Sequence, residues 1–113
     1  MEKYTPDHWV VLRLEWPGRP VIYKVLAGWS GSYLYGSSWK LNSGIVKATQ
    51  PEPGLYEFEG YSGSVYVGRT TRYGVGLSIA GVLEDIEAQA KTAGGSATVL
   101  PEDTDWTALP YGS

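Results

Sequence analysis

A single change in the spacing of the apolar residues constrains this chain most. Up to Arg69, apolar and polar residues alternate in short stretches, as is typical of half-buried strands. After Gly76 the apolar residues recur at steps of three and four, which gives one apolar stripe on a helix. The stripe consists of Ile79, Val82, Leu83, Ile86 and Ala90. Because Gly94-Gly95 ends this pattern, the sequence predicts one α-helix over about residues 76–92.

Short segments between turn signals predict the strands. The first alternates Val10, Leu12 and Leu14 on one face with Arg13 and Glu15 on the other. Turn residues then separate each segment from the next. The predicted strands are 8–16, 21–29, 33–41, 45–50, 55–60, 64–69 and 97–100. The predicted fold class is α+β, an antiparallel, curved β-sheet of about five to seven strands with one α-helix near the C-terminus.

A single helix can cover only one face of such a sheet. The chain holds 9 Tyr and 5 Trp against 1 Phe, and Tyr and Trp suit surfaces that are half buried and still hydrogen-bonded. The competing explanation is that aromatic residues simply favour strands. We expect much of an aromatic-rich sheet to lack cover from its own chain, so that a second copy or a bound ligand completes it, and we predict a homo-oligomer.

The 113 residues fit a single domain, 1–113, with an ordered core over about 8–106 and a loosely held tail from Thr107. The formal net charge of −3 and the lack of a basic block argue against duplex nucleic acid as a partner. No apolar run approaches the about 20 residues that a membrane helix needs, so no membrane partner is expected. The chain has no cysteine, which fits a reducing cytoplasm.

Two segments share the pattern Gly-aromatic-Ser-Gly-Ser, namely Gly28-Trp29-Ser30-Gly31-Ser32 and Gly60-Tyr61-Ser62-Gly63-Ser64. They could be ordinary Gly/Ser turns. They could also form anion-binding nests of backbone N–H groups, with the aromatic ring as a stacking face for a base. On the second interpretation a small nucleotide-like ligand binds here, and nearby cations meet its phosphate. The predicted ligand-binding residues are Trp29, Ser30, Tyr33, Trp39, Lys40, Tyr61, Ser62, Arg69 and Arg72.

Catalytic arrangements have little support in the sequence. His8 is the only histidine, and no cysteine is available as a nucleophile. Glu57 and Glu59 fall on one face of a strand and could serve a small carboxylate-based hydrolase, but a solvated strand face is the better explanation. We therefore expect a protein that is not an enzyme, with no catalytic residue, no bound metal and no cofactor.

Several blocks of the sequence resemble a family of small uncharacterised proteins from bacteriophages and prophages. They include 23–31, 38–45, 60–66, 80–83 and 101–106, so the resemblance spans about residues 9–106. It carries over no catalytic residue and implies a phage setting, in which small accessory proteins antagonise host antiviral defence. In that setting we expect a binding protein that sequesters a nucleotide-derived signal in the host cytoplasm. The alternative partner is a host enzyme, inhibited through an acidic and aromatic surface.

Overall fold

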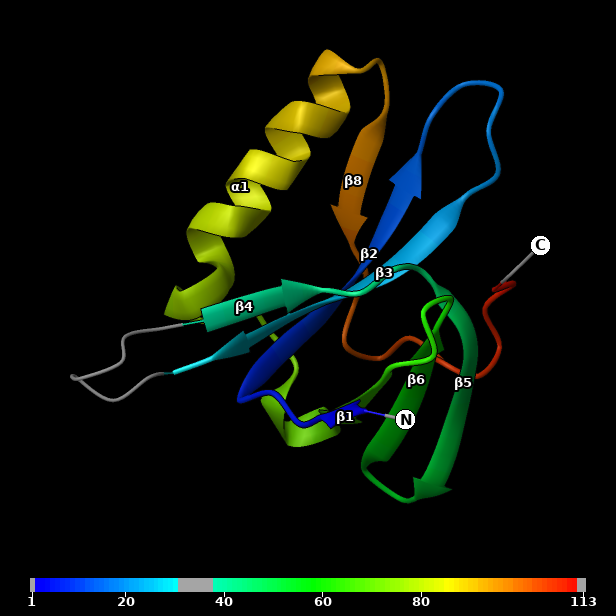
Figure 1. Ribbon diagram of the computed structural model, residues 1–113, viewed down its shortest axis with the longest axis vertical. Coiled ribbons are helices and arrows are strands. Elements are labelled where there is room, and N and C mark those ends of the chain that lie inside the picture. The colour runs from blue at the N-terminus through cyan, green and yellow to red at the C-terminus, as the bar shows by residue number, and fades with distance from the viewer. Residues whose placement is uncertain (1, 31–37, 112–113) are drawn as a thin grey trace.

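The computed structural model describes residues 2–30 and 38–111. They form two four-stranded sheets and one α-helix near the C-terminus (Figure 1). The helix α1 runs over Leu77–Thr92, with Gly76 as its N-cap, so the predicted helix over 76–92 is confirmed. The α+β class is confirmed as well.

The first sheet has the strand order β4-β3-β2-β8. At its centre, β2 (His8–Glu15) and β3 (Ile22–Trp29) form a long antiparallel hairpin, in register from His8↔Gly28 to Leu14↔Ile22. The edge strands β4 (Ser38–Leu41) and β8 (Ser96–Val99) are also antiparallel to their neighbours. The predicted segments 8–16, 21–29 and 97–100 therefore correspond to strands that pair side by side.

The second sheet has the order β1-β7-β6-β5. Here β5 (Ile45–Glu52), β6 (Leu55–Gly60) and β7 (Val65–Arg69) form an antiparallel meander, followed by a short 3-10 helix η1 (Thr70–Arg72). The N-terminal strand β1 (Lys3–Tyr4) adds to β7 in parallel, through Lys3↔Val65 and Tyr4↔Tyr66. Sequence analysis did not predict β1.

The strands divide between two sheets, where the sequence predicted one. The cause lies in β2, which is apolar on both faces: Val10, Leu12 and Leu14 lie on one, and Trp9 and Val11 on the other, all buried. A strand buried on both faces needs a layer on each side. Helix α1 supplies one layer, with Ile79 packed on the first face, and the second sheet supplies the other.

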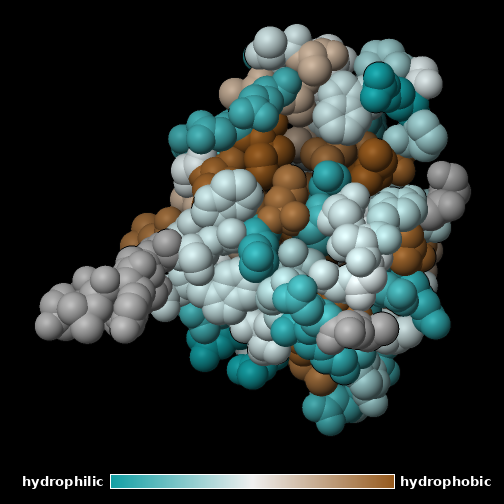
Figure 2. Space-filling model, viewed as in Figure 1, coloured by the Kyte–Doolittle hydropathy of each residue, from teal (hydrophilic) through white to brown (hydrophobic). Residues whose placement is uncertain are grey.

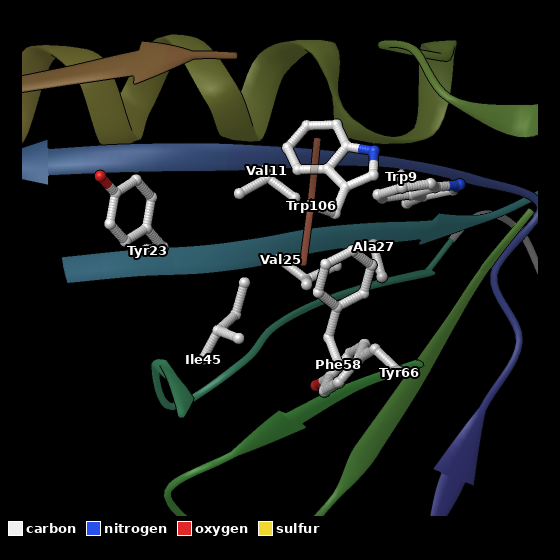
Figure 3. Close-up of a cluster of buried hydrophobic side chains, with 9 residues drawn as sticks. All are labelled: Trp9, Val11, Tyr23, Val25, Ala27, Ile45, Phe58, Tyr66 and Trp106. Atoms are coloured by element: carbon white, nitrogen blue, oxygen red, sulfur yellow. The ribbon is translucent and has the colours of Figure 1, made fainter. Parts of the chain in front are cut away.

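The layer between the two sheets is rich in aromatic side chains (Figure 3). Trp9 lies at its centre, with ring centroids 5.4 Å from Phe58, 4.7 Å from Tyr73 and 5.7 Å from Trp106. Trp106, 1% exposed, enters this layer from the segment that follows β8. The expectation that the aromatic sheet face lacks cover from its own chain is therefore wrong, because the meander and the C-terminal segment cover it.

Both ends of the described chain also pack on this core. Tyr4 of β1 contacts Tyr66, with centroids 5.2 Å apart. Near the other end, the Tyr111 hydroxyl donates to the Trp106 carbonyl at 2.6 Å, and its ring packs edge-on against Tyr23. The packed residues thus extend beyond the predicted core of 8–106 at both ends, to Tyr4 and to Tyr111. The sequence signal was the apolar and aromatic content of the tail itself, Leu109 and Tyr111.

Tyr73 ties three parts of the chain together. Its hydroxyl donates to the Leu100 carbonyl at 2.6 Å and accepts the Val11 N–H at 3.2 Å, while its ring stands edge-on to Trp9. Burial raises the pKa of Tyr73 to about 12.

No helix in the part of the chain that the structure describes has the length and apolar character needed to cross a membrane.

Trp106→Ala should destabilise the protein by about 3 to 5 kcal/mol, the usual cost of deleting a buried Trp side chain. Urea unfolding followed by circular dichroism measures this loss. Trp39→Ala is the matched control, because Trp39 is 48% exposed and should cost far less. Equal losses in the two variants would show that the C-terminal segment is not part of the core.

The stability of the protein should fall as pH rises above about 10. The Tyr73 hydroxyl ionises from pH 10 in the unfolded chain, whereas in the folded chain its pKa is about 12, so alkaline pH favours unfolding. Tyr111, whose pKa burial also raises, acts in the same direction. Tyr73→Phe should reduce this pH dependence while lowering stability at neutral pH by about 1 to 3 kcal/mol, because the Val11 N–H loses its acceptor. Chemical denaturation at a series of pH values from neutral to strongly alkaline measures the free energy of unfolding and tests both statements. If this free energy depends on pH in Tyr73→Phe as it does in the parent, the assignment to Tyr73 is contradicted.

Candidate functional site

A groove of about 590 Å³ lies where β1 passes the β3–β4 hairpin. The pairing of β1 with β7 fixes one wall, and the pairing of β4 with β3 fixes the other. The lining residues are Lys3, Tyr4, Thr5, Trp29, Ser38, Trp39 and Lys40. The structure thus brings three predicted ligand residues, Trp29, Trp39 and Lys40, to one groove.

Tyr4 organises the wall of this groove. Its ring stands edge-on to Trp29, with centroids 6.3 Å apart, and the Lys40 ammonium lies 5.0 Å from the ring centroid. The Tyr4 hydroxyl donates to a Glu2 carboxylate oxygen at 2.6 Å, and this hydrogen bond raises the pKa of Tyr4. The groove therefore presents aromatic rings with a cation already positioned beside them.

Hydrogen bonds to the N-terminal segment fix the position of Trp29 and of the residue that follows it. Its indole N–H donates to the Thr5 carbonyl at 3.1 Å, and the next backbone N–H, of Ser30, donates to an Asp7 carboxylate oxygen at 2.8 Å. The exposed Ser30 thus uses its backbone donor on a carboxylate of the chain itself. Gly31, Ser32 and the predicted ligand residue Tyr33 lie outside the described residues.

Trp39 and Trp29 lie on opposite faces of their sheet. Trp39 pairs with Gly28, and a Cβ placed on Gly28 would meet Ser78 and Ile79 of α1. Opposite residues in an antiparallel pair point to the same face, so the Trp39 side chain is directed to the helix side. Lys40 pairs instead with Ala27 of the aromatic layer and shares a face with Trp29. Trp29 and Trp39 therefore line the groove from opposite faces of the sheet.

The second Gly-aromatic-Ser-Gly-Ser segment forms the tight turn between β6 and β7. Its successive backbone N–H groups donate to the chain itself, from Gly60 to Ser64 O, from Tyr61 to Gly44 O, from Ser62 to Ser43 Oγ and from Gly63 to Gly60 O, all at 2.9 to 3.0 Å. Gly63 adopts a φ of +90°, which favours glycine. Because these donors are occupied, this turn does not offer the predicted anion-binding nest.

The remaining predicted residues lie away from the groove. Tyr61 is 62% exposed and lines a separate hollow of about 500 Å³ with Arg19 and Ile22. Arg69 ends β7 and Arg72 lies in η1, and neither lines the groove.

The cations that line the groove are Lys3 and Lys40. Lys3 pairs with Glu57 at 3.2 Å in an exposed contact that contributes little stability.

Sequence reasoning missed Lys3, Tyr4 and Thr5. A local signal was present, because Thr5 precedes Pro6 and a residue before proline favours extended backbone. Nothing local shows that this extended segment adds to β7, whose residues lie far along the chain. These residues became part of the site only through that pairing.

The carboxylates of the alternative hydrolase hypothesis lie elsewhere. Glu57 and Glu59 line a shallow hollow of about 220 Å³ on the outer face of the second sheet. His8 begins β2 in the first sheet, where its ring packs against Gly76 at the N-terminus of α1. Among the described residues, no group of three or more His, Asp or Glu side chains is placed to hold a metal ion.

The groove therefore combines a rigid aromatic wall, two lysines and a volume within the range of small-molecule sites. These are the elements for binding a flat, anionic molecule, and the part of the chain around them shows no nucleophile paired with a base. Comparison with known protein families, with characterised proteins and with solved structures finds no match to this chain, so its chemistry must be judged from the groove itself.

Proposed function

We propose that this chain is a non-catalytic binding protein whose groove captures a small, nucleotide-like ligand. The observation that carries the proposal is the triad of Tyr4, Trp29 and Lys40, which joins aromatic rings and a cation within one groove. A base stacked on an aromatic side chain contributes about 1 to 3 kcal/mol. The Lys40 ammonium, which lies beside the Tyr4 ring, would meet the phosphate.

The rigidity of the triad supports this function. Trp29 is hydrogen-bonded to Thr5, and the Tyr4 ring packs on Tyr66 of the core, so both are ordered before a ligand arrives. A preformed site loses little conformational entropy on binding, which raises the affinity available from a few contacts. This property suits a protein that must hold a scarce molecule and perform no reaction on it.

In the phage setting that the sequence resemblance implies, such a protein would act in the host cytoplasm and sequester a nucleotide-derived signal of antiviral defence. The proposal requires only that the chain bind this signal, and it requires no reaction. It moves the phosphate contact from Arg69 and Arg72, which the sequence favoured, to Lys40.

Calorimetry and thermal-shift assays with cyclic dinucleotides, ADP-ribose derivatives and mononucleotides test the proposal. At least one of these should stabilise the protein in a concentration-dependent way. Lys40→Met should then weaken binding by about 10- to 100-fold, as expected for loss of a charge-assisted contact.

Lys47→Met is the matched control, because Lys47 is an exposed lysine on β5 that does not line the groove. It removes the same charge and should leave the affinity unchanged. If no ligand stabilises the protein, or if both lysine variants weaken binding equally, the proposal fails. A host protein that co-purifies in stoichiometric amount with the ligand-free chain would favour the inhibitor hypothesis instead.

A further inference from the structure

The free edge of β4 combines unpaired backbone groups with exposed apolar side chains. The hydrogen bond from Asn42 N–H to Val25 O marks these two residues as a hydrogen-bonded position of the β3–β4 ladder. Such positions alternate along an antiparallel pair, so Lys40 also points its N–H and C=O toward β3. The N–H and C=O of Trp39 and Leu41 therefore point to the opposite side, where no strand lies among the described residues.

Apolar side chains border this edge on the helix face. Trp39 is 48% exposed and Leu77 is fully exposed. Leu77 is the first residue of α1. The next residue, Ser78, lies against Gly28, and Gly28 pairs with Trp39 in the β3–β4 ladder. Figure 2 shows apolar side chains gathered where α1 meets this sheet. A soluble chain rarely leaves a large leucine and a tryptophan together in water without a partner.

The other sheet edges are protected. The edge strand β5 carries Pro51 and the exposed Lys47, and its pairing with β6 contains two register shifts. Proline, lysine and irregular pairing all discourage addition of another strand. The edge strand β1 has only two residues, and α1 packs beside β8. β4 carries an exposed lysine as well, Lys40, but among the described edge strands it alone has an exposed tryptophan, Trp39.

We propose that β4 pairs antiparallel with β4 of a second copy of this chain. An antiparallel edge is complementary to itself about a two-fold axis, which is the commonest symmetry of protein dimers. Opposite residues must share a face, and the outward backbone groups of Trp39 and Leu41 must lie at hydrogen-bonded positions, which restricts the register. The register centred on Lys40 would place two like charges opposite each other, which is destabilising. The register centred on Trp39 places Trp39 opposite Trp39 of the second copy and Ser38 opposite Lys40 of the second copy.

This pairing would join the two four-stranded sheets that contain β4 into one continuous sheet. The two Trp39 side chains would pack together on the helix face, with Leu77 of each copy beside them. Stable dimers usually bury about 1,200 Å² or more, so the short strand must be supplemented by these apolar side chains. The inference goes beyond the proposed ligand function and does not depend on it.

A cysteine cross-link tests the pairing directly, because the chain contains no cysteine of its own. Directly opposed residues at a hydrogen-bonded position have Cα atoms about 5.5 Å apart, which is within the range of a disulfide. Trp39→Cys should therefore form a covalent dimer under mild oxidation, measured by mass spectrometry and non-reducing electrophoresis. Tyr61→Cys, at an exposed site on the turn between β6 and β7, is the matched control and should cross-link much more slowly. Equal rates for the two variants would overturn the proposal.

Since Trp39→Cys removes part of the interface, Leu77→Glu provides a second measurement. Glutamate in the first turn of α1 is favourable for the helix, so the fold should be kept. Sedimentation velocity over a series of concentrations should show a dimer for the unsubstituted chain, whereas Leu77→Glu should be dissociated at loading concentrations where the parent is still a dimer. A chain that is monomeric at every concentration, or a variant that dimerises as well as the parent, would show that β4 does not pair with itself. Neither readout involves a nucleotide, and Lys40→Met leaves the outward backbone groups intact, so this inference and the ligand proposal fail separately.

Discussion

The structure depends on the burial of one tryptophan. Trp9 lies on the central strand β2, is fully buried, and packs on Phe58, Tyr73 and Trp106. Its indole N–H donates to the Arg69 carbonyl at 2.8 Å, which ties the end of β7 to the first sheet. Its own carbonyl accepts from Gly74 N–H at 2.9 Å, which fixes the entry to α1. One residue therefore connects both sheets, the helix and the C-terminal segment.

The groove follows from the same arrangement. With the second sheet held against β2 and β3, the parallel pairing of β1 with β7 carries Tyr4 to the end of β3, where it meets Trp29 and Lys40. The site lies between segments that are distant in the chain. Its rings are ordered by the core, while its lysines remain at the surface.

Local patterns predicted most of the secondary structure and little of its assembly. The alternation in 8–16 and the three- and four-residue spacing of Ile79, Val82, Leu83 and Ile86 depend on neighbouring residues alone, and the strand β2 and the helix α1 are confirmed. The division into two sheets and the place of Trp106 depend on contacts between remote residues, which a single sequence does not display. For the site, the predicted ligand residues included both Trp39 and Lys40, although alternation along a strand places neighbouring residues on opposite faces, and the position of Tyr4 required the β1–β7 pairing. The two similar turns gave no guide, because their hydrogen bonds with Asp7 and with Ser43 depend on tertiary neighbours.

Gly68 lies directly beneath the indole of Trp9, and a Cβ atom placed on it would come within 2.7 Å of the ring. Neither member of this pair can change freely while the other remains. A larger residue at position 68 becomes acceptable only after the tryptophan has been replaced by a smaller side chain, and that first replacement opens a cavity at the centre of the molecule. The close contact between the Trp9 ring and Gly68 therefore couples the two positions, so that either substitution alone is destabilising.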